Sequence, residues 1–298
     1  MTTNTPTIVD IGICTFRRPQ LADMLASIAA LALPFNCTIR IIVADNDESP
    51  SAQIMVAEET LKLGLNITYI HAPAKNISIA RNACLAAAKA DYLAFIDDDE
   101  LVDKQWLTHI LTTQRDTLAD IVLGPVHAVY LTSYPKWLLA GDYHSTKPYW
   151  VNGKIITGYA GNVLMKRNSP ALQGLHFRED LGVTGGEDFA FFLSATNAGA
   201  TIAYAPEAAA FEAVPPERAS MRWLMQRRIR YGETLVLPLI EARKQLRKNA
   251  LKYFIKAIAC YALMVLFCFT TARRTWQLRG TLHLGAARSL WRAAKQTA

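Results

Sequence analysis

The sequence is poor in the residues and patterns that mark several large classes of protein. Only five of its 298 residues are cysteine, with no CxxC pair, so neither a disulfide framework nor a cysteine zinc site is indicated. The six histidines show no HxxxH spacing, and no internal repeat or low-complexity tract occurs. Neither GxxxxGK[ST] nor GxSxG is present, which argues against P-loop NTPases and serine hydrolases.

The few cysteines and the N-terminal residues indicate the cellular compartment. The cysteines lie in apolar stretches, which predicts buried free thiols and a reducing compartment. The N-terminus MTTNTPTIVD has no basic-then-apolar signal, so we expect the catalytic part in the cytoplasm. What is abundant is apolar sequence, 51% of the chain, enough for a full core. The net charge of +7 comes from Lys and Arg that crowd towards the C-terminus.

The first hundred residues alternate strand and helix patterns. Buried strands are predicted at 9–14, 38–44, 66–71 and 91–96, with helices at 20–31, 51–63 and 76–90 between them. Strands separated by helix-length segments indicate βαβ units and a mostly parallel α/β sheet. Ligands bind such sheets at the carboxyl ends of the strands, where Thr15, Asp45 and Asp97 fall.

The middle of the chain is less regular. A strand is expected over 121–130, followed by a long loop over 133–150 that is rich in aromatic residues and proline. Another strand pattern covers 159–165, a helix opens at Gly185-Gly186 and runs through Phe192, and a short strand covers 201–204.

The acidic run Asp97-Asp98-Asp99 directly follows an apolar strand. Three adjacent carboxylates repel one another, and a bound cation offsets that repulsion. Asp97 and Asp99 would project to the same side of an extended segment, which suits Mg²⁺ or Mn²⁺ carrying a diphosphate. The alternative is an exposed acidic turn that caps the next helix.

Two further groups have both a functional and a plain interpretation. Glu187-Asp188 could be a helix cap, or could supply a general base for an attacking hydroxyl. Arg81 and the cluster around Arg227, Arg228 and Arg230 could be solvated helix surface, or could contact a nucleotide and its leaving diphosphate.

In this order the segments IGICTFRRP, VADND, NISIARN, FIDDDE, GGED and RRIRYG resemble glycosyltransferase family 2, from about Ile8 to Gly232. The pair CTFRRP and FIDDDE is most similar to non-processive enzymes of bacterial exopolysaccharide assembly, of the succinoglycan glucosyltransferase kind. The resemblance implies a GT-A fold, a Rossmann-like and mostly parallel sheet flanked by helices. The implied domains are residues 1–245, with a nucleotide half to 100 and an acceptor half after it, and a membrane-associating helical segment, 246–298.

The resemblance also implies roles for individual residues. Asp188, with Glu187 beside it, would be the base of an inverting transfer, and Asp99 with Asp97 would ligate Mg²⁺ or Mn²⁺. The expected donor is a nucleotide-sugar, a UDP-sugar. The residues implied to hold it are Thr15, Arg17, Asp45, Arg81, Asp97, Asp98, Arg228 and Arg230. The family's processive members carry QxxRW, whereas this chain has Arg227-x-x-Arg230-Tyr231, which favours addition of a single sugar.

The C-terminal segment points to a membrane. Residues 257–272 form an uncharged apolar run, short for a perpendicular span and flanked by lysines and arginines. A buried core helix is the alternative, but the basic, Trp-bearing tail favours an in-plane or partly inserted anchor on an anionic leaflet. A lipid-linked or saccharide acceptor at the cytoplasmic face of the inner membrane would fit this position.

Other classes of protein fit the sequence less well. A metal-dependent nucleotidyltransferase would also use acidic residues and Mg²⁺, but it should show a glycine-rich phosphate loop near the first strand. A non-catalytic membrane scaffold that keeps the fold would not need intact Asp97, Asp99 and Asp188. No nucleic-acid partner is expected, since no nucleic-acid-binding motif occurs.

Overall fold

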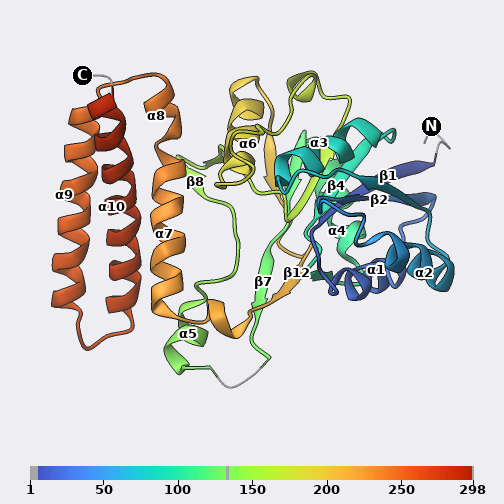
Figure 1. The fold of residues 1–298 in the computed structure, drawn as a ribbon, viewed down its shortest axis with the longest axis horizontal. Coiled ribbons are helices and arrows are strands. Elements are labelled where there is room, and N and C mark those ends of the chain that lie inside the picture. Colours follow the sequence, from blue (N-terminus) through green and yellow to red (C-terminus); the bar gives the residue numbers. More distant parts are fainter. Residues whose placement is uncertain (1–5, 132–133, 297–298) are drawn as a thin grey trace. The chain divides into compact units, whose positions relative to one another are not determined.

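A computed structural model describes residues 6–131 and 134–296 (Figure 1). Within these residues the main sheet has seven strands in the order β11-β6-β10-β4-β1-β2-β3. Its strands are β1 (Thr7–Thr15), β2 (Cys37–Asp45), β3 (Ile67–His71), β4 (Tyr92–Ile96), β6 (Ile121–Leu123), β10 (Asn162–Lys166) and β11 (Ile202–Tyr204). All neighbours pair in parallel except β10, which is antiparallel to β4 and β6. The mostly parallel sheet is therefore confirmed.

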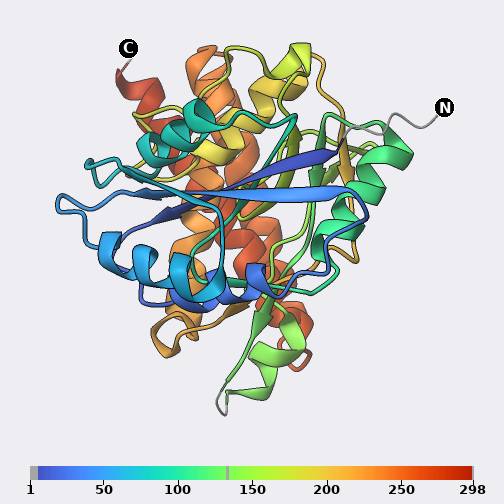
Figure 2. The same ribbon diagram turned by 90° about the vertical axis from the view of Figure 1, so that its right-hand side faces the viewer.

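Helices cover both faces of this sheet (Figure 2). On one side α1 (Leu21–Ala29) and α2 (Gln53–Leu63) share a core with alternate residues of β1, and on the other α3 (Ile77–Ala87) shares a second core with β2 and β4. A strand covered on both faces reads as an uninterrupted apolar run, which is why the first strands were visible in the sequence.

The segment expected to form one strand over 121–130 forms two. The chain leaves the main sheet after β6, where Gly124 donates its N–H to the Asn162 carbonyl and Pro125 has no N–H to continue the ladder. The single-strand prediction was wrong because the pattern of apolar residues continues through this break. A second sheet of three strands, in the order β5-β12-β7, contains β5 (Glu100–Val102), β12 (Ala210–Ala213) and β7 (Val126–Val129).

The expected loop over 133–150 contains regular structure in its described part; residue 133 lies outside the described residues. Helix α5 (Lys136–Gly141) interrupts the expected loop. The last residue of that loop, Trp150, begins β8 (Trp150–Val151), which pairs with β9 (Lys154–Ile155). The helix expected after Gly185-Gly186 is α6 (Glu187–Asn197), and α4 (Trp106–Thr117) packs in the same core as α1.

The chain forms two compact units. The first comprises the residues up to Val129 together with Ser145–Ala213 and holds all three sheets. The second comprises Tyr130–His144 and the residues from Val214 onward. It groups α5 with α7 (Met221–Leu235), α8 (Leu237–Glu241), α9 (Leu246–Leu266) and α10 (Ala272–Gln296). The division of labour expected for residues 1–100, 101–245 and 246–298 remains a prediction.

Close packing inside the second unit explains one feature of the RRIRYG motif. A Cβ on Gly232 of α7 would lie 2.0 Å from the Leu282 carbonyl oxygen of α10, and a Cβ on Gly285 would lie 2.4 Å from the Ile229 carbonyl oxygen. The two helices therefore cross backbone to backbone, and Gly232 serves this crossing.

The uncharged run over 257–272 is not one helix. α9 ends at Leu266, a turn follows, and α10 begins at Ala272. Helix α9 is long and apolar enough to cross a membrane by length and composition, and only 17% of its apolar window is buried. A buried core helix, the alternative considered from the sequence, does not match so exposed a surface.

Candidate active site

Three predicted site residues meet at one edge of the main sheet. Thr15 ends β1 and pairs in register with Asp45, which ends β2. The neighbouring strand β4 ends at Ile96, so Asp97 follows at the same edge. Parallel strands bring their carboxyl ends together, and this edge is where α/β sheets bind ligands.

Asp45 is fully buried, and both of its carboxylate oxygens accept hydrogen bonds from its own chain. Its Oδ1 accepts a hydrogen bond from the Asp47 N–H at 3.0 Å, and its Oδ2 accepts from the Ala52 N–H and the Tyr69 hydroxyl, each at 2.8 Å. Asp45 thus fixes the loop between β2 and α2. A direct contact with the donor base remains a prediction.

The two arginines after β1 pair with different acids. Arg17 Nε lies 2.7 Å from Asp47 Oδ2, and this pairing lowers the pKa of Asp47 to about 2. Arg18 Nη1 lies 3.0 Å from Asp99 Oδ2, at the acidic cluster itself. Arg17 was the residue expected at the donor site, and that role remains a prediction. Arg18, which the sequence did not single out, is the one that contacts the cluster.

The acidic cluster is withdrawn from solvent at two of its four positions. Asp98 and Glu100 are buried, and no hydrogen-bond partner among the described residues meets Asp98 Oδ2 or Glu100 Oε2. Burial raises the pKa of Asp98 to about 7 and that of Glu100 well above its ordinary value, and the neighbouring carboxylates add to both shifts. Gly161 makes room here, since a Cβ on it would lie 2.7 Å from Glu100 Oε1.

Such a cluster suits a hard divalent cation. Among the described residues no group of three or more His, Cys, Asp or Glu side chains is arranged to hold a metal by itself. Mg²⁺ and Mn²⁺, however, are commonly bound by one or two carboxylates and the phosphates of a ligand. The buried, unpartnered Asp98 Oδ2 is an atom that positive charge would satisfy. The residues therefore fit Mg²⁺ or Mn²⁺ at Asp97 and Asp99, each of which now faces an arginine.

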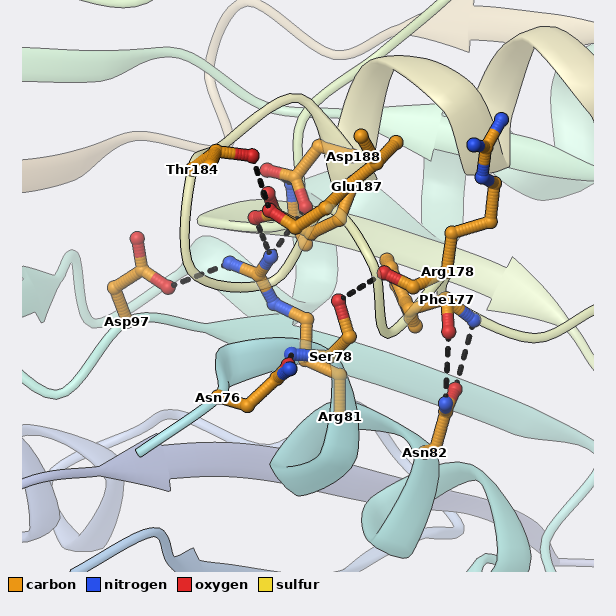
Figure 3. Close-up of polar contacts among 12 residues, drawn as sticks. Asn76, Ser78, Arg81, Asn82, Asp97, Phe177, Arg178, Thr184, Glu187 and Asp188 are labelled. Carbon is orange, nitrogen blue, oxygen red and sulfur yellow. Dashed lines mark hydrogen bonds and ion pairs between the residues drawn. The ribbon is translucent and has the colours of Figure 1, made fainter. Parts of the chain in front are cut away.

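Arg81 joins the acidic cluster to the predicted base (Figure 3). Its buried guanidinium lies 2.7 Å from Glu187 Oε1 and 3.5 Å from Asp97 Oδ1, and it also donates to Asp188 Oδ1. Asp188 Oδ2 accepts from the Ala160 N–H at 3.1 Å. The sequence predicted that Arg81 contacts the nucleotide. In the structure it holds three carboxylates at fixed positions, and contact with the nucleotide remains a prediction.

The same contacts set the acidity of Asp188, the predicted base. Burial raises the pKa of Asp188 to about 6, Arg81 opposes that rise, and Glu187 adds to it. A carboxyl group in this range is mostly ionised at neutral pH yet more basic than an exposed aspartate, which is the balance a general base requires.

Comparison with known proteins decides the family. The model of Glycosyl transferase family 2 matches residues 10–170, more than half of the chain. The chain belongs to glycosyl transferase family 2. Succinoglycan biosynthesis protein ExoM of Rhizobium meliloti (strain 1021) is 46% identical over 286 residues, which cover 95% of this chain and 92% of the relative. Putative glycosyltransferase EpsH of Bacillus subtilis (strain 168) is 32% identical over 82 residues, 28% of this chain and 24% of that protein.

Solved structures agree on the fold of this glycosyltransferase. Mannosyltransferase PcManGT from Pyrobaculum calidifontis, in complex with GDP-Man and Mn²⁺, matches with a TM-score of 0.63 at 18% identity, over 97% of this chain and 88% of that one. S. aureus TarS 1-349 in complex with UDP-GlcNAc matches with a TM-score of 0.56 at 14% identity, over 98% and 92%. At such identities the likeness concerns the fold alone, and the expected GT-A fold is confirmed.

A set of contacts that the sequence did not reveal positions the loop that leads to the predicted base of this glycosyltransferase. Asn82 of α3 pairs with both backbone groups of Phe177: its Nδ2 donates to the carbonyl at 2.8 Å, and its Oδ1 accepts from the N–H at 2.7 Å. Ser78 Oγ donates to the Arg178 carbonyl, and Asn76 Nδ2 to the Glu179 carbonyl, each at 2.7 Å. Asn76 is the N-cap of α3, and Ser78 and Asn82 lie one helical turn apart within it; that spacing was the available signal.

Two glycines complete the loop before α6. Gly185 and Gly186 have φ of +88° and +103°, a conformation that side-chain-bearing residues rarely adopt. Gly186 occupies the N-cap of α6, so the turn delivers Glu187 and Asp188 into the first turn of that helix. The two glycines of the GGED motif are therefore required by the backbone geometry of the turn. Close approach of a substrate to these glycines remains a prediction.

The arginine cluster belongs to the second unit. On α7 the Arg227 guanidinium lies 5.3 Å from the ring centroids of both Trp223 and Tyr231, and that of Arg228 lies 5.8 Å from the Tyr231 ring. Burial lowers the pKa of Arg228. The contribution of Arg228 and Arg230 to donor binding stays a prediction.

Proposed function

We propose that this family 2 enzyme transfers one sugar, with inversion, from a nucleoside-diphosphate sugar to an acceptor hydroxyl. The observation that carries the proposal is the Arg81 bridge, which holds a strand-end acidic cluster beside a separate carboxylate, Asp188. Inverting transfer needs two such sites, one for the leaving group and one for the proton of the acceptor.

At the donor side, Thr15 and Asp98 line the sheet edge, and Asp97 and Asp99 would hold Mg²⁺ or Mn²⁺. The bound ion would neutralise charge that develops on the leaving diphosphate. Arg18, which already contacts Asp99, would move towards that diphosphate when the cation takes the carboxylate. A UDP-sugar is the donor we favour.

At the acceptor side, Asp188 takes the hydroxyl proton. The Ala160 N–H and Arg81 each occupy one lone pair of its two oxygens, which leaves the other lone pairs for the proton. The acceptor oxygen then attacks the anomeric carbon from the face opposite the leaving diphosphate. Glu187 neutralises part of the charge of Arg81, which leaves Asp188 more basic.

The biological setting follows from the relative and from the second unit. A relative that is 46% identical along nearly the whole chain is named for succinoglycan biosynthesis, and we infer exopolysaccharide or cell-surface glycan assembly for this chain. The exposed apolar surface of α9 supports association with the cytoplasmic face of the inner membrane, where a lipid-linked acceptor would be presented. A nucleotidyltransferase or a scaffold finds no support in the family match.

Two measurements test the proposal. Thermal shift with UDP-glucose, UDP-GlcNAc and GDP-mannose, with and without Mn²⁺, should show stabilisation by a nucleotide sugar that depends on the cation. Asp99→Asn should lose that dependence. Asp188→Asn should keep the stabilisation and lose transfer to acceptor extracts. If no nucleotide sugar stabilises the protein, or if Asp188→Asn transfers sugar at the wild-type rate, the proposal is wrong.

A further inference from the structure

The turn between α9 and α10 exposes a cap of large apolar side chains. Phe269 is fully exposed, and Val265 and Leu266 at the end of α9 are exposed to 65% and 73%. Residues 257–272 contain no charged side chain, so this cap ends a wholly uncharged part of the hairpin. Exposed apolar side chains gathered in this way mark a surface that is covered in use.

A second segment packs against the same end of the hairpin. The Arg274 guanidinium, in the first turn of α10, lies 4.6 Å from the centre of the Trp137 ring of α5, and the Tyr143 hydroxyl lies 3.4 Å from Thr275 Oγ1. Figure 1 shows α5 and the α9–α10 turn near the same end of this unit. The apolar cap comprises the exposed side chains of the turn itself, Val265, Leu266, Phe267 and Phe269.

The charge around this cap selects its partner. After Glu241 the sequence has twelve Lys and Arg and no Asp or Glu. Arg273 and Arg274 begin α10 directly behind the cap, and Arg279 lies over the ring of Trp276, 5.5 Å from its centroid. Arginine and tryptophan next to an apolar tip match the headgroup layer of an anionic bilayer, with the tip in the acyl chains.

The hairpin excludes a membrane span by α9. Helix α10 packs along it from end to end: Ala250 shares a core with Leu290, and the Tyr261 hydroxyl lies 3.1 Å from Thr281 Oγ1. Moving α9 across a bilayer would either strip α10 away or carry its arginines into hydrocarbon, at about 2.5–3.5 kcal/mol each.

Side-on burial of α9 is also disfavoured. Its exposed face carries Lys248, Lys252 and Lys256 among the apolar residues of its first half. The cap contains no charge, so it can enter acyl chains without carrying lysines with it. Arg273 and Arg274 limit the depth to about 5–10 Å, the depth typical of interfacial helices.

We propose that this glycosyltransferase is a monotopic membrane protein that inserts the apolar cap of the α9–α10 hairpin, tip first, into an anionic leaflet. The inference rests on the proposed membrane association and is independent of the sugar transfer. The competing explanation is that a second copy of the chain covers the cap in a dimer.

The native thiol at the tip allows a direct test. Cys268 is half-buried while the other four cysteines are buried, so a thiol-reactive, environment-sensitive fluorophore should label it selectively in the full-length protein. With vesicles of phosphatidylcholine and phosphatidylglycerol in equal parts, its emission should rise and be quenched by lipids brominated near the headgroup. A probe at Ile255→Cys in a Cys268→Ser background, about 16 Å along the helix from Leu266, should stay in water.

Each alternative gives a different pattern. Quenching of both probes would show side-on burial, and quenching of the Cys268 probe only by lipids brominated near the chain end would show deep insertion; either overturns the proposal. Absence of any response, with elution as a dimer at rising protein concentration, would assign the cap to a second copy and overturn it too.

A matched pair of variants provides the affinity measurement. Phe269→Asn should weaken partition into the mixed vesicles about tenfold or more. Phe35→Asn, in the first unit, removes an equally exposed phenylalanine and should change nothing. Equal effects of the two changes would contradict the proposal. Thermal shift by UDP and Mn²⁺, measured in parallel, reports on the proposed function separately, because none of the proposed donor-site residues lies in the apolar cap.

Discussion

Asp188 makes the pH dependence of the enzyme predictable at the scale of a single residue. Its pKa is raised from 3.8 to about 6, and the base must be ionised to accept a proton. The kcat/KM should therefore rise about tenfold per pH unit below pH 6 and level off above it. The raised pKa means that the folded state holds the proton more tightly, so the stability contribution of this group is lost as pH rises from 4 to 6. A rate plateau that extends down to pH 4 would show that Asp188 is not the base.

Arg81 is the residue whose exact chemistry the site depends on. Arg81→Lys keeps one positive charge but cannot reach Glu187, Asp188 and Asp97 together. We expect kcat to fall about 10²-fold through lost positioning, and the apparent pKa in the pH–rate profile to move above 6. Arg292→Lys is the matched control, since that arginine pairs with Glu233 in the second unit, outside the proposed site, and an ion pair so exposed is worth at most about 1 kcal/mol. Similar rates for the two variants would contradict the positioning role.

At the residue scale, the sequence predicted which side chains reach the sheet edge better than it predicted their partners. Thr15, Asp45 and Asp97 follow from the strand pattern because strand ends share an edge. The partner of Asp45 is Tyr69 and that of Arg81 is Asp188, across distances in sequence that no local pattern encodes. The choice between Arg17 and Arg18 for the acidic cluster depended on a left-handed backbone at Arg17, φ +53°, which turns the two side chains apart.

At the scale of elements, the contacts of α3 predict that the catalytic loop is positioned from outside. Asn82→Ala would leave the N–H and carbonyl of Phe177 without their partners and cost about 1–3 kcal/mol. The loop leads directly to Glu187 and Asp188, so we expect kcat to fall while UDP affinity stays within twofold. Asn249→Ala, which removes one exposed bond to the Lys244 carbonyl, is the comparison and should leave both unchanged. A loss of UDP affinity in Asn82→Ala would contradict this prediction, because it would show that Asn82 supports the donor site instead of the loop.

Elements were predictable where one strand is buried on both faces and helices alternate with strands, as in the first hundred residues. The break between β6 and β7 was missed because the apolar residues on its two sides belong to different sheets, and only Gly124-Pro125 separates them. The hairpin of α9 and α10 was missed for a related reason. Turns are usually located by their polar residues, but the turn between these helices is apolar although it is exposed. Hydropathy alone therefore cannot locate it.

For the whole molecule, the division into two compact units predicts two separable unfolding transitions. All the proposed donor-site residues except Arg228 and Arg230 lie in the first unit, so UDP with Mn²⁺ should raise the transition temperature of that unit alone. At a UDP concentration of one hundred times Kd, the free energy of unfolding of the first unit should increase by about 2.7 kcal/mol. Gly232→Ala places a Cβ against the Leu282 carbonyl and should lower only the other transition. Gly280→Ala meets the movable ring of Tyr261 at 3.2 Å and should lower it less. Differential scanning calorimetry separates these outcomes. A single transition that shifts with both the ligand and Gly232→Ala would mean that the units unfold as one, and the helices of the second unit would then be thermodynamically linked to the donor site.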